Sequence, residues 1–149
     1  MTPRGRSAID PAQAATGNGA VDAKGASPAT IMVVEDAPEF QELVVLTLTL
    51  EPHLKVGFIA SSGEEALDAL DRVAPDLILL DFRLPGIDGL ETARRMKKQR
   101  PDVKIALVTA YTEEVLKRAA HDAHLEAVIP KADFSLRRVL DVLGSTPSA

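Results

Sequence analysis

The sequence contains no cysteine, so the chain can form neither a disulfide nor a thiolate metal site. This composition suits a reducing compartment, and we expect a cytoplasmic protein. No apolar run approaches the roughly 20 residues that a membrane-spanning helix needs. The sequence therefore predicts a chain that does not enter a membrane.

Positive charge does not dominate either. The formal net charge is −5, whereas binding to a nucleic-acid backbone requires a concentrated basic face. A basic run at 94–100 lies on one side of a predicted helix, but no aromatic residue is interleaved with it. A solvated helix face is the preferred interpretation.

The hydrophobic content of 46% in 149 residues is sufficient for one domain with a real core. Residues 1–29 are rich in small and polar residues, which predicts a disordered tail. We expect the domain at 30–144 and a short C-terminal tail at 145–149. The few residues after the last predicted helix leave no room for a DNA-binding or other output domain, so a stand-alone domain is expected.

Short apolar runs alternate with helical patterns along the domain, and the central run fits a strand covered on both faces of a parallel sheet. The predicted strands are 31–34, 55–60, 77–80, 104–108 and 127–130. Residues 40–50 fit either a strand or a helix. Because a right-handed crossover between parallel strands needs a helix there, we predict a helix.

Side-chain patterns predict the faces and caps of the helices. The inner face of the first helix is expected to carry Phe40, Leu43, Val44 and Thr47. Ser62 and Thr112 are predicted N-caps of the second and fourth helices. The inner face of the fourth helix is expected to carry Val115, Leu116, Ala119 and Ala120.

The central strand 77–80 ends at Asp81, and Pro85, Gly86 and Gly89 then mark a tight loop. In open α/β sheets, ligands bind outside the C-terminal ends of the strands. Asp81 is therefore where chemistry is expected.

Other predicted strands end at Glu35-Asp36, Thr109-Ala110 and Lys131. The ends of parallel strands lie side by side. The sequence thus predicts three carboxylates, a hydroxyl and an ammonium group at one edge of the sheet.

Four segments carry these residues: Val33-Val34-Glu35-Asp36, Leu79-Leu80-Asp81-Phe82-Arg83-Leu84-Pro85-Gly86-Ile87-Asp88-Gly89, Val108-Thr109-Ala110 and Ile129-Pro130-Lys131. In this order they resemble the receiver domain of two-component response regulators, over roughly residues 30 to 144. The resemblance implies a flavodoxin-like, doubly wound α/β fold. Its sheet would have five parallel strands in the order 2-1-3-4-5, with five helices.

The resemblance also implies a phosphoacceptor switch in a two-component phosphorelay. Asp81 would accept a phosphoryl group from a sensor histidine kinase or a histidine phosphotransfer protein. The reaction would require Mg²⁺, held by Glu35, Asp36, Asp81 and the backbone carbonyl of Arg83. A downstream protein would then read the phosphorylated state by direct contact.

Three further residues would serve this switch. Lys131 and the Thr109 hydroxyl would contact phosphoryl oxygens, and the small Ala110 would leave room for the group. The family pattern is broken at Val128, where an aromatic residue is usual, and at Ala132, where proline is usual. We therefore expect the signal to leave the domain by an uncommon route.

Two pairs of residues are predicted to modulate the switch. Arg83 and Tyr111 occupy the positions that flank the approach of water to the phosphorus atom, and together they would prolong the lifetime of the phosphoryl group. Val45 and Leu48 are predicted to lie outside the buried face of the first helix and to dock on a partner.

Other functions remain as alternatives. An aspartate-nucleophile phosphatase or phosphotransferase would need a second acid two residues after Asp81, where Arg83 stands and cannot transfer protons. A nucleotide-binding domain would need a glycine-rich turn after the first strand, where 35–38 has none. A phosphorylation-independent adaptor would not need the acidic residues.

Overall fold

The structure, a computed structural model, describes residues 27–111 and 113–144. The predicted tails lie outside these residues, except for 27–29. Ala29 pairs with Leu54 and is the first residue of a strand, so the sheet begins slightly earlier than predicted.

The sheet has five parallel strands in the order β2-β1-β3-β4-β5, which confirms the predicted fold class. The strands are β1 (Ala29–Val34), β2 (Leu54–Ala60), β3 (Leu77–Leu80), β4 (Lys104–Thr109) and β5 (Ala127–Pro130). All four residues of β3 are buried. An uninterrupted apolar run therefore became the central strand, because helices cover both of its faces.

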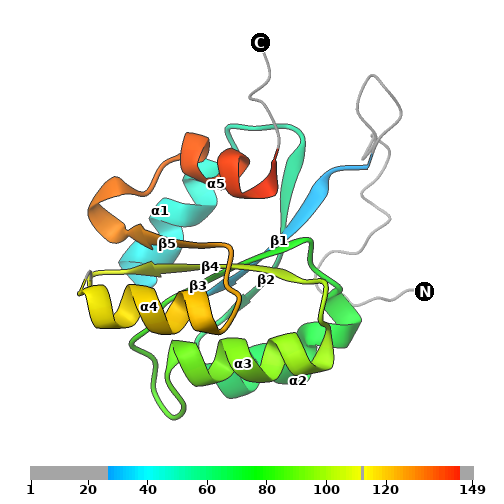
Figure 1. Cartoon of the computed structure of the whole chain (residues 1–149). Helices are drawn as coiled ribbons and strands as arrows, with labels where there is room; N and C mark the ends of the chain where they lie inside the picture. Colours follow the sequence, from blue (N-terminus) through cyan, green and yellow to red (C-terminus); the bar gives the residue numbers. More distant parts are fainter. Residues whose placement is uncertain (1–26, 112, 145–149) are drawn as a thin grey trace.

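The helices are α1 (Pro38–Leu48), α2 (Gly63–Val73), α3 (Gly89–Gln99), α4 (Glu114–Asp122) and α5 (Leu136–Leu143), with a short 3-10 turn at Lys131–Asp133. Helices α1 and α5 lie on one face of the sheet, and α2, α3 and α4 lie on the other (Figure 1). The buried apolar residues accordingly form two clusters, one on each face.

Local side chains determine where several helices begin. The hydroxyl of Ser62 accepts a hydrogen bond of 3.1 Å from the Glu65 N–H at the start of α2. Asp88 caps α3 through a bond of 2.8 Å from the Glu91 N–H. The predicted cap Thr112 lies outside the described residues, and α4 begins at Glu114.

The ambiguous stretch at 40–50 forms α1, as predicted. Phe40 and Val44 pack inward as predicted, but the predicted inner face is wrong at Leu43. Val44 and Leu48 are each 1% exposed, whereas Leu43 is 49% exposed. The buried residues follow an i, i+4 spacing from Phe40, which turns Leu43 toward solvent. Leu48 therefore belongs to the core and cannot dock on a partner, and Val45 is half-buried.

The prediction for α4 is wrong at one position. Val115 is 81% exposed, while Leu116 and Ala120 are buried. The pair at 116 and 120 faces the sheet, because residues four apart share one side of a helix. The neighbouring position 115 then points outward.

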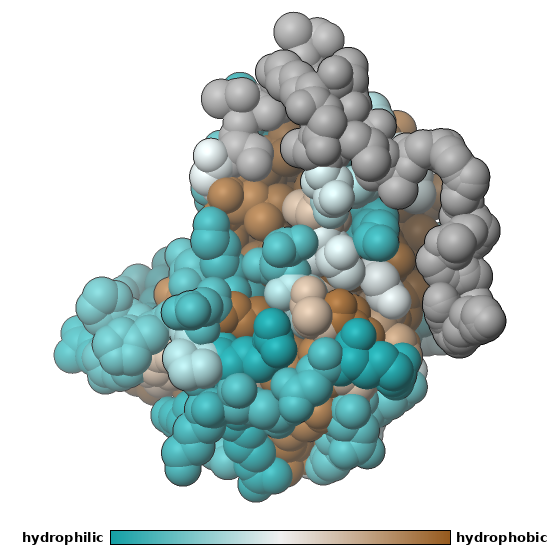
Figure 2. All heavy atoms as spheres, turned by 90° about the vertical axis from the view of Figure 1, so that its right-hand side faces the viewer, coloured by the Kyte–Doolittle hydropathy of each residue, from teal (hydrophilic) through white to brown (hydrophobic). Residues whose placement is uncertain are grey.

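Figure 2 shows the side of the molecule at the right of Figure 1, where hydrophilic side chains cover most of the lower part and hydrophobic surface is visible above them. The exposed large apolar residues among those described are Leu43, Leu46, Leu50, Ile59 and Val115.

Within 27–111 and 113–144, no helix combines the length and the apolar character needed to cross a bilayer.

Candidate functional site

The residues predicted to meet at one edge of the sheet follow or end four different strands. Glu35 and Asp36 follow β1, and Asp81 follows β3. Thr109 is the last residue of β4, and Lys131 follows β5. The parallel register of the sheet brings these strand ends to a common edge.

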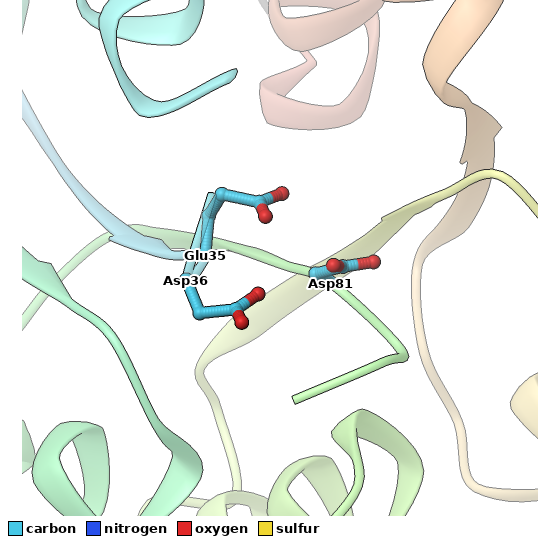
Figure 3. A group of neighbouring side chains, drawn as sticks. All are labelled: Glu35, Asp36 and Asp81. Carbon is cyan, nitrogen blue, oxygen red and sulfur yellow. The ribbon is translucent and has the colours of Figure 1, made fainter. Parts of the chain in front are cut away.

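The three carboxylates form a compact group. One oxygen each from Glu35, Asp36 and Asp81 lies within 4.8 Å of the other two. Figure 3 shows the side chains of Glu35 and Asp36 extending toward the segment that carries Asp81. Glu35 and Asp81 are buried, whereas Asp36 is exposed, so the group opens to solvent on the side of Asp36.

Lys131 reaches this group from β5. Its Nζ lies 2.9 Å from Oε1 of Glu35 and 3.4 Å from Oδ2 of Asp81. A buried carboxylate is costly unless it is paired with a cation. The ammonium group of Lys131 supplies that compensation for two of the three acids.

The surroundings shift the protonation of both partners. Burial, and then the neighbouring charge of Glu35, raise the pKa of Asp81, although Lys131 and a backbone hydrogen bond from Arg83 act in the opposite direction. Burial alone lowers the pKa of Lys131, but hydrogen bonds and charges from Glu35 and Asp81 raise it above its usual value. The site therefore holds excess negative charge that a further cation would neutralise.

Backbone hydrogen bonds hold the acids in place. The Asp81 N–H donates to the Val34 carbonyl at 3.0 Å, which ties the end of β3 to the end of β1. The Glu35 carboxylate accepts a bond of 3.0 Å from the Ala37 N–H, and the Gln41 side chain donates to the Glu35 carbonyl. The first turn of α1 thus supports the acidic group.

Thr109 ends β4, which pairs with β3 in the sheet, and Ala110 follows it. Thr109 is fully buried, and its hydroxyl accepts a hydrogen bond of 3.1 Å from the Tyr111 N–H. Ala110 is exposed. A hydroxyl and a small side chain therefore stand at the end of the strand next to Asp81.

Arg83 and Tyr111, predicted to flank the site, contact each other. The guanidinium carbon of Arg83 lies 5.0 Å from the centroid of the Tyr111 ring, within the range of a cation–π contact. The Tyr111 ring also meets Phe82 edge-on, with centroids 6.0 Å apart. The loop after Asp81 and the residue after Ala110 are joined by these contacts.

Two contacts of the site were not predicted. The sequence predicts Phe40 on the inner face of the first helix, but its ring also faces the ammonium group of Lys131. It predicts no role for Gln41. Lys131 lies far from Phe40 in the chain, and Gln41 donates to a backbone carbonyl, which any residue could offer, so no sequence pattern marks either contact.

The donor set suits a hard divalent cation. Carboxylate oxygens are the ligands that Mg²⁺ prefers, and Asp36 leaves a route from solvent. In the part of the chain that the structure describes, this is the one group of three or more histidines, cysteines, aspartates or glutamates close enough to hold a metal ion.

Comparisons with known proteins point to one family. Residues 31–143 match the response regulator receiver domain. The chain is 36% identical over 109 residues to protein-glutamate methylesterase/protein-glutamine glutaminase 1 from Syntrophus aciditrophicus, covering 72% of this chain and 31% of the relative. It is 33% identical over 109 residues to the nitrate/nitrite response regulator protein NarL of Escherichia coli K12, covering 70% of this chain and 50% of that relative.

A solved structure agrees on the fold. The receiver domain protein (CheY-like) from Methanospirillum hungatei JF-1 superposes with a TM-score of 0.70 at 24% identity, covering 79% of this chain and 92% of that one. The chain spans about a third to a half of the length of the two curated relatives, and the expectation of a stand-alone domain stays a prediction. With the match over residues 31–143, the chain belongs to the response regulator receiver domain family.

Proposed function

We propose that this domain is a Mg²⁺-dependent phosphoacceptor that takes a phosphoryl group onto Asp81 and signals by protein contact. The observation that carries the proposal is the position of Asp81. Its carboxylate lies at the end of the central strand, beside two further acids and one lysine ammonium. A carboxylate nucleophile, ligands for a metal ion and an ammonium group that can contact phosphoryl oxygens thus lie side by side.

The transfer would take place at one oxygen of the Asp81 carboxylate. This oxygen forms a bond to phosphorus, while the bond from phosphorus to the histidine nitrogen of the donor breaks. The electron pair of the broken bond stays on the imidazole nitrogen. The product is an aspartyl-phosphate on this chain and a dephosphorylated histidine on the donor.

The chain's own residues would orient the group and balance its charge. Glu35, Asp36, Asp81 and the Arg83 carbonyl are the proposed ligands of Mg²⁺, which supplies charge neutralisation on the phosphoryl oxygens. Lys131 would contact one phosphoryl oxygen as a point charge.

The end of β4 would complete the phosphoryl site. The Thr109 hydroxyl would donate to another phosphoryl oxygen, and the small Ala110 would leave space for the group.

The partners belong to the same proposal. The donor would be a sensor histidine kinase or a histidine phosphotransfer protein in the cytoplasm. Its docking surface would be the outer stripe of α1, where Leu43 is 49% and Leu46 is 59% exposed, instead of the predicted pair with Leu48. Apolar residues at this exposure are typical of an interaction site.

Mass spectrometry after incubation with acetyl phosphate and Mg²⁺ tests the proposal. We expect one added phosphoryl group per chain, stable to acid and labile to base. Asp81→Asn or chelation of Mg²⁺ should abolish it. Full labelling of the Asp81→Asn variant would contradict the proposal, and steady turnover of small phosphate esters would favour a phosphatase instead.

A further inference from the structure

Lys131 has an aromatic neighbour in addition to its two carboxylates. Its Nζ lies 4.6 Å from the centroid of the Phe40 ring, while the same atom is 2.9 Å from Glu35 and 3.4 Å from Asp81. The face of an aromatic ring carries negative charge density and attracts an ammonium group. The ammonium group is therefore held by three partners.

The Phe40 ring is itself held in place. It meets the Phe134 ring edge-on, with centroids 5.8 Å apart and an interplanar angle of 65°. Both rings are partly buried and pack against the apolar cluster beneath α1 and α5. The orientation of the ring face toward Lys131 is thus supported by Phe134, which lies between the 3-10 turn and α5.

The ring also limits the access of water to the ammonium group. The side chain of Lys131 is 25% exposed, whereas the side chains of Glu35 and Asp81 are 3% and 6% exposed. A lysine on a flexible stem moves readily toward solvent. An apolar ring face on one side leaves fewer positions in which the ammonium group can be hydrated.

We propose that Phe40 is a positioning residue for Lys131, which holds the ammonium group where it meets Asp81 and an incoming phosphoryl group. The ring acts through its contact with Lys131. The effect on phosphorylation rests on the proposed function, but the contact itself does not. The two parts are therefore tested by separate measurements.

The first measurement uses the metal-free, unphosphorylated protein. The ε-methylene protons of Lys131, assigned by their loss in Lys131→Arg, should be shifted upfield in the NMR spectrum by the ring current of Phe40. Phe40→Leu should move this signal to the position of exposed lysines. An unchanged signal in Phe40→Leu would overturn the proposal.

A matched control is available on the other side of the sheet. Phe58 on β2 is partly buried, and the guanidinium carbon of Arg72 lies 5.3 Å from its ring centroid. Phe58→Leu removes a similar ring and a similar cation–π contact far from Lys131. It should leave both the Lys131 signal and the rate of labelling unchanged.

The second measurement is the rate of labelling by acetyl phosphate at saturating Mg²⁺. We expect Phe40→Leu to lower this rate about fivefold, which corresponds to roughly 1 kcal/mol, with an unchanged Mg²⁺ dissociation constant. Phe40→Tyr, which keeps the ring face, should restore it. Thermal melting checks that each variant is folded.

A double-mutant cycle separates positioning from a general effect on the fold. In the Lys131→Ala background, Phe40→Leu should have no further effect on labelling, because its target is absent. A fivefold loss in that background would show that Phe40 acts through the fold, and would overturn the proposal. If the wild-type protein is not labelled at all, the proposed function fails, and the NMR shift still decides whether Phe40 positions Lys131.

Discussion

At the scale of single residues, the site places a buried acid in a strongly negative environment. Asp81 is 5% exposed and lies next to Glu35, and Lys131 is the one cationic side chain among the described residues that pairs with both. Removing an unfavourable charge can stabilise a fold even when it abolishes function. The Asp81 carboxylate should therefore lower the stability of the folded domain while it serves the proposed phosphorylation.

Asp81→Asn should raise the free energy of unfolding at pH 7 in Mg²⁺-free buffer. The pKa of Asp81 is raised in the folded state from its ordinary value of 3.8. As the pH rises, the unfolded chain loses this proton first, so the wild type loses stability between the unfolded and the folded pKa. Asparagine avoids this loss. Urea unfolding at several pH values measures the difference.

The stability gain of Asp81→Asn should be larger at pH 7 than near pH 3.5, because the raised pKa of Asp81 costs the folded state stability only as the pH rises above the ordinary value of 3.8. Asp122→Asn, which removes an exposed acid of α4, is the control and should not reproduce the gain in stability at pH 7. An Asp81→Asn variant that is less stable than the wild type at pH 7 would contradict the prediction.

The contact between Arg83 and Tyr111 leads to a prediction about phosphate lifetime. The stacked pair would shield the phosphorus from the water that attacks opposite the Asp81 oxygen. The double variant Arg83→Asn, Tyr111→Ala should lose its phosphoryl group about tenfold faster than the wild type. This ratio corresponds to a hydrolysis barrier lower by roughly 1.4 kcal/mol. The rate of this loss is measured by following the decay of the phosphorylated species with Mg²⁺ present and no kinase. Decay at the wild-type rate or more slowly would show that the pair does not shield.

At the scale of elements, α1 combines support of the site with an apolar outer surface. Its inner residues Phe40, Val44 and Leu48 pack on the sheet, and its first turn supports Glu35 through Gln41. Its outer stripe exposes Leu43 and Leu46. A partner that docks on this helix would lie next to the acidic group.

Leu43→Glu combined with Leu46→Glu should slow phosphotransfer from the cognate kinase at least tenfold, because charge replaces apolar contact area. Labelling by acetyl phosphate should be unaffected. Val115→Glu on α4, an exposed apolar residue of another helix, is the matched control and should leave both rates unchanged. Equal loss of both rates in the double variant would show a folding defect.

At the scale of the whole molecule, a cation at the acidic group would join the ends of two strands. The proposed ligands follow β1 and β3, and their neighbour Lys131 follows β5. A ligand that binds only the folded state stabilises the entire domain. The metal site should therefore be visible in global unfolding, without any phosphodonor.

Mg²⁺ should raise the melting temperature of the wild-type protein in a concentration-dependent manner. At a Mg²⁺ concentration of about 100 times the dissociation constant, the free energy of unfolding would rise by roughly 2.7 kcal/mol. Asp36→Asn should remove most of this gain, and the exposed control Asp122→Asn should retain it. Thermal melts at constant ionic strength measure the effect, and an equal gain in Asp36→Asn would place the ion elsewhere.

The amino-acid sequence by itself determined the five strands and the residues at their ends, and its resemblance to receiver domains supplied the strand order. The apolar run at 77–80 and the proline and glycines after Asp81 are local features that predict a strand followed by a loop. In a parallel sheet, the C-terminal ends of the strands lie along one edge. Residues 35, 36, 81, 109 and 131 could be predicted to meet because each follows or ends a strand. The resemblance to receiver domains rests on these same segments.

Only the tertiary structure decided which side of α1 is buried, and it did so against the prediction. Apolar residues occur nearly all round this helix, so the sequence pattern did not select one rotation. The positions of the sheet and of α5 selected the side of Leu48. Val115 of α4 was misplaced for the same reason: an apolar residue is buried only if another element covers it.

The contacts and charges of the site were also decided by tertiary structure. Phe40 meets Lys131, and Arg83 meets Tyr111, although in each case the two residues lie far apart in the sequence. The raised pKa of Asp81 depends on burial and on Glu35. Such effects arise from distances in space, whereas the sequence specifies only distances along the chain.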